Sequence, residues 1–174
     1  MLKKTRIYAV IGIFILSFIC HFVFDLFPNI LFSIFFPVNE SIWEHMKIIF
    51  SATIIYSFID KLILNKKNVK YNNFYLQLFV SSFLGIIIYL IIYLPIYSII
   101  NENIFVSISL LLIVYIIMQY ISYKIMTLKE LNIPSYIFCI LIILVYSVFT
   151  YLTYKPINNY IFYDTKNEVY GIKK

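Results

Sequence analysis

Long hydrophobic stretches separated by short polar segments dominate this chain of 174 residues. A helix rises 1.5 Å per residue, so a stretch of about 18 apolar residues can cross a hydrocarbon core roughly 30 Å thick. Segments of about ten residues with alternating polarity, which are typical of a membrane β-barrel, do not occur in the sequence. The pattern therefore predicts an all-α, polytopic membrane helix bundle with about five transmembrane helices, at residues 7–24, 48–64, 74–96, 104–123 and 133–154.

One further apolar segment, residues 26–38, is too short to span a bilayer. It contains Pro28, Asn29 and Pro37, and prolines interrupt the hydrogen bonding of a helix. Irregular backbone at membrane depth is tolerated only against protein or a water-filled cavity. We therefore expect an interfacial or re-entrant segment that lines the outer mouth of the bundle.

The composition favours one membrane domain over residues 1–174, with a polar C-terminal tail at residues 155–174. Hydrophobic residues make up 63% of the chain and charged residues only 13%, whereas soluble domains contain about 25% charged residues. The net charge of +6 does not indicate nucleic-acid binding, because Arg6 is the single arginine and the lysines lie between hydrophobic runs. The expected surroundings are the lipid bilayer, and a homodimer or another membrane protein stays open as a partner.

The lysine and arginine residues also predict an orientation, since the cytoplasmic loops of membrane proteins are enriched in both. With the N-terminus inside, nine of the fourteen fall in cytoplasmic segments, and four of the other five fall in the tail. We expect an N-in, C-out topology whose first span is retained, because no small-residue cleavage site follows it. Frequent Ile, Tyr, Asn and Lys indicate an AT-rich bacterial gene, so the expected location is the bacterial cytoplasmic membrane.

Residues 37–47 concentrate polar side chains within this hydrophobic chain, with two of the eight acidic residues, one of the two histidines and the only tryptophan. Part of this segment has a structural explanation. Ser41-Ile42-Trp43-Glu44 fits a helix capping box, in which the side chains of Ser41 and Glu44 each accept the other's backbone N–H, and Trp43 suits the lipid–water boundary. A cap stabilises a helix by only about 1 kcal/mol. Burying several ionisable groups costs more than this, so the remaining polar residues indicate a site.

Under the expected topology, three groups of polar residues reach the outer end of the bundle. His21 and Asp25 share one face of the first span, residues 37–47 begin the second span, and the tail follows the fifth. The candidate catalytic residues are Glu40, Glu44 and His45. The candidate ligands of a divalent metal such as zinc are His21, Glu44 and His45, although their spacing is not the His-Glu-x-x-His pattern. The candidate binding residues are His21, Asp25, Asn39, Ser41, Trp43, Lys47, Asp164 and Tyr170.

Two polar residues inside the spans are expected to have structural roles. Asp60 lies beside Lys61 near the inner end of the second span, where we expect either an interfacial ion pair or two neighbouring side chains that snorkel to the interface. Gln119 in the fourth span is expected to make a hydrogen bond between helices.

The run P-V-N-E-S-I-W-E-H-M-K at residues 37–47 resembles the signature P-V-N-E-S-[VI]-W-E-H-x-K of a family of small bacterial integral membrane proteins of unknown function. His21, Asp25 and Asn29, and the ending F-Y-D…Y-G-I at residues 162–172, are also similar to that family. The likeness covers nearly the whole chain. It implies a bundle of about five spans with a shared polar motif, and it brings no established activity.

Three functions stay open at this point. The polar cluster could belong to a scaffold or binding protein, in which Asp164 or Tyr170 hydrogen-bonds within residues 39–47 and holds the tail against the bundle. It could belong to a membrane-embedded, metal-assisted hydrolase acting on a lipid-type substrate, since such an enzyme needs an activated water and an acid or base beside it. It could also serve as the proton or solute site of a transporter or a transporter-associated subunit.

Overall fold

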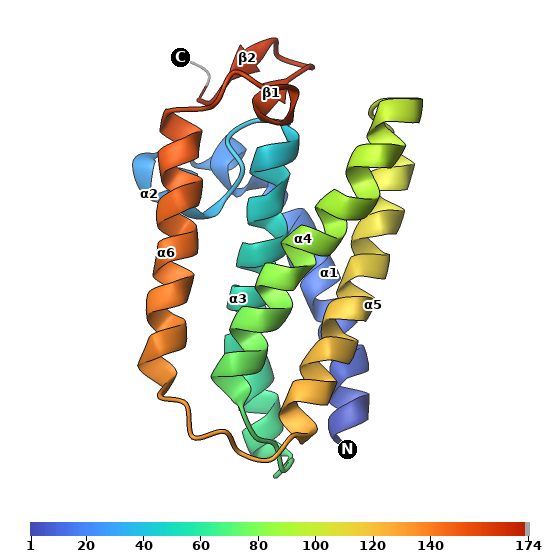
Figure 1. Cartoon of the computed structure of the whole chain (residues 1–174), viewed down its shortest axis with the longest axis vertical. Coiled ribbons are helices and arrows are strands. Elements are labelled where there is room, and N and C mark those ends of the chain that lie inside the picture. Colours follow the sequence, from blue (N-terminus) through green and yellow to red (C-terminus); the bar gives the residue numbers. More distant parts are fainter. Residues whose placement is uncertain (173–174) are drawn as a thin grey trace.

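In the computed structural model, which describes residues 1–172, five long helices stand side by side (Figure 1). They are α1 (Leu2–Leu26), α3 (Ile42–Lys66), α4 (Phe74–Ile100), α5 (Ile104–Thr127) and α6 (Ser135–Tyr154). All five are long and apolar enough to cross a membrane, which confirms the predicted all-α bundle. Lys173 and Lys174, which the predicted tail includes, lie outside the described residues.

The helices extend beyond the predicted spans at several ends. α1 begins at Leu2 rather than at residue 7, so the basic N-terminus forms its first turn. α4 continues through Pro95 to Ile100 rather than ending at residue 96. Proline removes one backbone donor, and transmembrane helices tolerate this loss where neighbouring groups satisfy the freed carbonyl.

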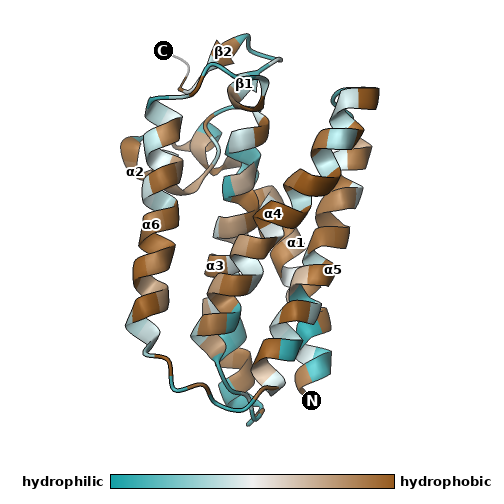
Figure 2. Cartoon of the chain, viewed as in Figure 1, coloured by the Kyte–Doolittle hydropathy of each residue, from teal (hydrophilic) through white to brown (hydrophobic). Residues whose placement is uncertain are grey.

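α3 is the central helix of the bundle. In its most apolar window 56% of the residues are buried, against 17–28% in the other four long helices. α3 packs against α1 and α4, α5 packs against the same two helices, and α6 lies at the edge beside α2 and α4. Gly12 of α1 lies directly against the Tyr56 ring of α3, where any larger side chain would collide. Hydrophobic residues cover most of the bundle's sides, and hydrophilic residues gather at its ends (Figure 2).

We call the end that carries the N-terminus the inner end, and the end that carries the tail the outer end, after the predicted orientation. A buried polar network lies at the inner end. Arg6 of α1 forms an ion pair with Asp60 of α3 and donates to Gln119 of α5 at 3.3 Å. Gln119 thus makes a hydrogen bond between helices, as predicted. The predicted pair of Asp60 with Lys61 is wrong, because consecutive residues of a helix face different ways, and Lys61 donates to the Tyr75 hydroxyl at 2.7 Å.

The apolar segment at residues 26–38 contains a short helix, α2 (Ile30–Phe35), at the outer end of the bundle. The Asn29 side chain caps this helix by accepting the Phe32 N–H at 3.0 Å. Ile30 and Leu31 are largely exposed, while Ser33 is buried toward the bundle. The interfacial or re-entrant placement of this segment stays a prediction.

The tail folds over the outer end as a 3₁₀ turn, η1 (Tyr160–Phe162), and two short antiparallel strands, β1 (Tyr163–Asp164) and β2 (Val169–Tyr170). Gly171 follows with φ +65°, a backbone conformation that favours glycine. η1 packs against α3. The segment that the sequence marks only as a polar tail therefore forms ordered structure beside the start of α3 (Figure 1).

Candidate functional site

Glu44 and Lys47 form a buried ion pair one turn apart at the start of α3. The Lys47 Nζ lies 2.8 Å from the Glu44 Oε2, and the Lys47 and Glu44 side chains are 0% and 2% exposed. Lys47 also donates to the Ser33 carbonyl of α2 at 2.8 Å. The Glu44 carboxylate further accepts the Val38 N–H at 3.1 Å and the Thr153 hydroxyl of α6 at 2.6 Å. The pair thus connects α2, α3 and α6, and both oxygens of Glu44 are occupied by protein groups.

The capping arrangement at the start of α3 differs in part from the predicted capping box. The Ser41 hydroxyl accepts the Glu44 N–H at 3.3 Å, as expected of an N-cap. The return bond is not made by Glu44, because the Ser41 N–H donates to the Asn39 Oδ1 at 2.9 Å. The Trp43 ring is half-buried and packs against Phe149 and Phe162 with centroids 5.2 and 4.9 Å away. Trp43 therefore packs α3 against α6 and the tail. Its predicted location at the lipid–water boundary stays a prediction.

Asp164 joins the tail to the segment that precedes α3. Its carboxylate accepts the Glu40 N–H at 3.0 Å and also the backbone N–H groups of Lys166 and Asn167 and the Asn167 side-chain amide. Burial raises the pKa of Asp164, but these hydrogen bonds outweigh burial and hold the pKa below its usual value. Asn39 adds a second connection by donating to the Gly171 carbonyl at 2.7 Å. Both contacts fix the tail onto residues 39–40.

Tyr170 does not take part in this connection. Its hydroxyl donates to the Asn158 Oδ1 at 2.8 Å, within the tail. Of the two residues expected to hold the tail against residues 39–47, Asp164 makes that contact and Tyr170 bonds elsewhere.

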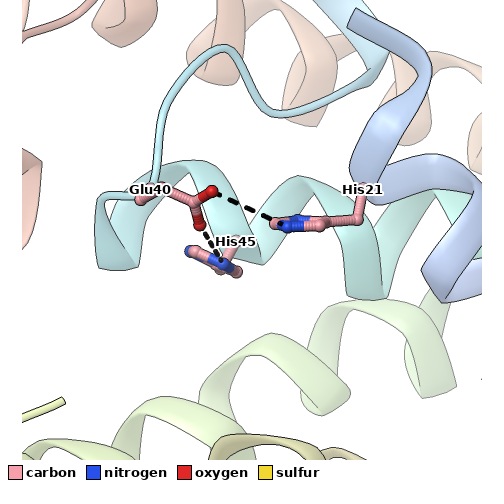
Figure 3. A group of neighbouring side chains, drawn as sticks. All are labelled: His21, Glu40 and His45. Carbon is pink, nitrogen blue, oxygen red and sulfur yellow. Dashed lines mark ion pairs between the residues drawn. The ribbon is translucent and has the colours of Figure 1, made fainter. Parts of the chain in front are cut away.

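His21, Glu40 and His45 form a second, more open group beside these structural contacts (Figure 3). The Glu40 carboxylate lies between the two imidazoles, with Oε1 3.8 Å from the His21 Nε2 and Oε2 3.4 Å from the His45 Nε2. The two rings are inclined by 28° to each other, with centroids 5.4 Å apart. Each side chain comes from a different part of the fold: α1, the loop before α3, and α3 itself (Figure 3). The three side chains are 23–29% exposed, so the group can be reached from outside.

One hydrogen bond determines which nitrogen of His45 is free. The His45 Nδ1 lies 2.9 Å from the Ser41 carbonyl oxygen, which can only accept, so Nδ1 carries the proton. In a ring that carries only this proton, Nε2 directs its lone pair toward the Glu40 carboxylate, and in a doubly protonated ring Nε2 donates to that carboxylate. Two electron-rich atoms facing each other at 3.4 Å repel unless a proton or a cation lies between them. A backbone carbonyl that orients the far nitrogen in this way is the usual outer contact of a metal-bound histidine.

The same three residues offer ligand atoms that all lie within 4.8 Å of one another. Within residues 1–172 this is the one such group of three or more His, Cys, Asp or Glu side chains. The predicted metal ligands were His21, Glu44 and His45. The structure brings the two histidines together, but Glu44 pairs with Lys47. The carboxylate beside the histidines is that of Glu40. Nitrogen and carboxylate ligands of this kind suit zinc and similar ions.

Two cavities meet at this group. The larger, about 670 Å³, is bounded by α1, α2 and the tail, and its polar lining includes Asp25, Asn29 and Asn39. The smaller, about 370 Å³, runs between α1, α3, α4 and α5 and is lined mainly by isoleucine, phenylalanine and tyrosine. His21, Glu40 and Lys166 line both cavities. Both volumes lie in the range of about 300–1,000 Å³ that is usual for ligand pockets.

Lys166 is the residue of this region that the sequence did not single out. Its Nζ lies 3.7 Å from the Glu40 Oε1, and its side chain is 71% exposed. The turn between β1 and β2, which Asp164 organises, places Lys166 in the lining of both cavities. A tail with four lysines gives no sequence signal that one of them reaches a residue 126 positions earlier in the chain.

The comparison with family models matches residues 1–172 to the Family of unknown function (DUF6512). The comparisons with curated proteins and with solved structures gave no match.

Proposed function

We propose that this chain, which belongs to the family of unknown function DUF6512, is an integral membrane protein that binds a divalent transition-metal ion at the outer end of its helix bundle. The ligands are His21, Glu40 and His45, and an ion of the zinc type suits them. The observation that carries the proposal is the bond from the His45 Nδ1 to the Ser41 carbonyl, which directs Nε2 toward Glu40.

The surrounding contacts support a preformed site. Residues 37–47 separate into two sets with different partners. Asn39, Ser41, Trp43, Glu44 and Lys47 are used to hold α2, α3, α6 and the tail together. The side chains of Glu40 and His45 are placed differently. His45 bonds to the Ser41 carbonyl, and Glu40 faces the two histidines and the exposed Lys166. A rigid framework that positions a few open ligands is what a binding site requires.

The geometry is compatible with tetrahedral zinc. Zinc bonds of about 2.0–2.1 Å place neighbouring ligand atoms roughly 3.4 Å apart. The His45 Nε2 is 3.4 Å from the Glu40 Oε2 and the His21 Nε2 is 3.8 Å from the Glu40 Oε1, and one ligand atom of each residue lies within 4.8 Å of the others, so the side chains must rotate toward a common point to hold the ion. Lys166 competes for Glu40, but its ammonium sits on a long exposed stem that can turn away.

The site is on the non-cytoplasmic side in this proposal, and the membrane is the bacterial cytoplasmic membrane. The lysine and arginine distribution supports this orientation, since Lys47 is buried against Glu44 and the outer loops carry no other lysine before the tail. Alkaline phosphatase fused to the C-terminus should be active in a bacterial host. Fluorescence from a green fluorescent protein fusion at the same position would contradict the orientation.

Zinc binding to the purified full chain tests the metal proposal. Chelator-treated protein in neutral detergent, titrated with zinc in a calorimeter, should bind about one ion per chain. His45→Ala and Glu40→Gln should each weaken binding by at least about 100-fold, since even outer contacts of metal ligands are worth 10–100-fold. Glu168→Gln, an exposed change in the same tail, is the matched control and should leave the affinity unchanged. Equal affinities in all four proteins would overturn the proposal.

Metal-assisted hydrolysis of a lipid-type substrate is a second candidate, favoured by one observation. Three protein ligands leave a fourth position for water, as in catalytic zinc sites, and the cavities beside the group leave room for a substrate. Glu44 is not available as the catalytic base, because both of its oxygens are bonded within the framework. Zinc-dependent release of product from a lipid ester, absent in Glu40→Gln, would establish hydrolysis; bound zinc without turnover would leave binding as the function.

A further inference from the structure

The two cavities at the outer end differ in character and share a boundary. The smaller one is a mainly apolar groove, whereas the lining of the larger one combines acidic, amide and basic side chains with apolar ones. His21, Glu40 and Lys166 form the boundary, because they line both. A ligand that fills both spaces must be apolar at one end and polar at the other, with its junction beside Lys166.

The apolar groove has the depth of one half of a bilayer. Along α4 it extends from Tyr97 to Tyr89, and eight residues of helix correspond to roughly 12 Å. One leaflet of a ~30 Å hydrocarbon core is about 15 Å deep. The groove begins at the outer end, where the polar headgroups of the outer leaflet lie in the expected orientation. An acyl chain of that leaflet therefore fits the groove with its headgroup beside Lys166.

The charges around the polar cavity indicate the kind of headgroup. Lys166 stands at the boundary with an exposed ammonium group, which attracts a phosphate. Asp25 lies one helical turn beyond His21, about 6 Å further out, and it is exposed to the same cavity. Two other carboxylates line this cavity: Asp164 accepts four hydrogen bonds, and Glu40 lies among His21, His45 and Lys166. Asp25 is therefore the carboxylate left for a ligand cation.

We infer that the site binds a phospholipid with a primary ammonium headgroup, of the phosphatidylethanolamine class. One acyl chain lies in the apolar groove, the phosphate lies against Lys166, and the ammonium lies against Asp25 in the polar cavity. The contacts with Lys166, Asp25 and the apolar groove do not depend on the proposed metal ion. Lipid tails are as apolar as the groove, so the preference among lipids comes from the headgroup.

Native mass spectrometry of the full chain from mixed micelles tests this inference. The micelles contain equal amounts of phosphatidylethanolamine, phosphatidylcholine and phosphatidylglycerol with identical acyl chains. One phosphatidylethanolamine should be retained with a preference of about tenfold, the value of one charge-assisted hydrogen-bonded contact. Asp25→Asn should abolish the preference, and Lys166→Met should weaken the retention of all three lipids.

A pair of variants on α5 tests the acyl-chain position. Ile108→Trp fills the groove and should weaken retention of every lipid by about tenfold, comparable with one lost favourable contact. Ile113→Trp is the matched control, because Ile113 is 49% exposed on the same helix and does not line the groove, and it should leave lipid retention unchanged. Zinc binding should be the same in both variants, because neither isoleucine belongs to the three proposed ligands. Thermal unfolding of both variants shows whether either one fails to fold.

The outcomes separate this inference from the proposed function. If zinc binds but the three lipids are retained equally, or Ile108→Trp and Ile113→Trp behave alike, the lipid inference is overturned and the metal site stands. If zinc does not bind but phosphatidylethanolamine is retained in a manner that depends on Asp25 and Ile108, the metal proposal is overturned and the lipid site stands. Repeating the native mass spectrometry after chelator treatment shows how much a bound metal ion contributes to lipid retention.

Discussion

Removing one partner of the buried Glu44–Lys47 ion pair should strongly lower the free energy of unfolding of the protein. Lys47→Met leaves the Glu44 carboxylate buried beside an apolar side chain. Glu44→Gln leaves the Lys47 ammonium buried with only neutral acceptors, such as the Ser33 carbonyl. Neither side chain is more than 2% exposed, so water cannot replace the missing charge.

The expected magnitude follows from this burial. Removing one member of a buried ion pair costs about 3–5 kcal/mol, whereas removing both with well-packed replacements is often nearly neutral. The double variant Glu44→Gln/Lys47→Met loses the charges together and should cost much less than the sum of the single variants. It still forfeits some hydrogen bonds to Val38 and Thr153, each worth about 1 kcal/mol.

Thermal unfolding in a fixed neutral detergent measures the effect. For a chain of 150–250 residues, 1 kcal/mol corresponds to about 2–4 °C, so each single variant should lower Tm by about 6–20 °C. Lys155→Met, an exposed lysine just after α6, is the matched control and should change stability by less than about 0.5 kcal/mol. Single variants as stable as the control, or a double variant that loses the sum of the two, would refute the argument that this pair holds the outer end together.

Three further predictions concern the contacts around the site and at the inner end. Asp164→Asn should lower Tm by a few degrees and expose the tail to limited proteolysis, because it removes a charged acceptor of four hydrogen bonds, and the exposed Glu168→Gln should do neither. Asp60→Asn leaves the Arg6 guanidinium buried without a carboxylate and should cost about 3–5 kcal/mol in the same unfolding assay; unchanged stability would show that the pair is not buried in solution. Deleting residues 155–174 should lower both Tm and zinc affinity, since the tail positions Glu40, and a truncated protein with normal values of both would reject the role of the tail as a clamp.

The fold was largely predictable from the sequence because hydrophobic length alone identifies membrane-spanning helices. The five long helices and the irregular segment around α2 follow from the positions of apolar runs and prolines. The helix ends were less predictable. α4 continues through Pro95 to Ile100, because a membrane helix can accommodate a proline that would end most helices of soluble proteins.

The candidate site was predictable in its location and only partly in its members. Residues 37–47 place Glu40 and Glu44 four positions apart, and both are acidic residues close to the same histidine. Which of them faces His21 depends on Lys47, Val38 and other partners that bond to Glu44, and these contacts come from tertiary packing. Periodicity cannot supply such information.

Long-range pairs were the other part that the sequence could not supply. Lys166 reaches Glu40 because the tail turns back over the bundle, and Arg6 reaches Asp60 because α1 and α3 pack together near their inner ends. Single-sequence reasoning favours neighbours such as Asp60 and Lys61, which a helix in fact directs to different sides. The two wrong assignments, Glu44 instead of Glu40 beside the histidines and Lys61 instead of Arg6 beside Asp60, concern which charged side chains face each other. Neither changes the positions of the helices.

X-ray absorption at the zinc edge tests the metal site most directly. The purified, zinc-loaded full chain should show light-atom neighbours at about 2.0–2.1 Å, with the multiple scattering of two imidazoles. His21→Ala should retain zinc weakly and show one imidazole fewer, while Glu168→Gln should reproduce the parent spectrum. A spectrum without histidine scattering, or one that His21→Ala leaves unchanged, would contradict a metal site formed by His21, Glu40 and His45.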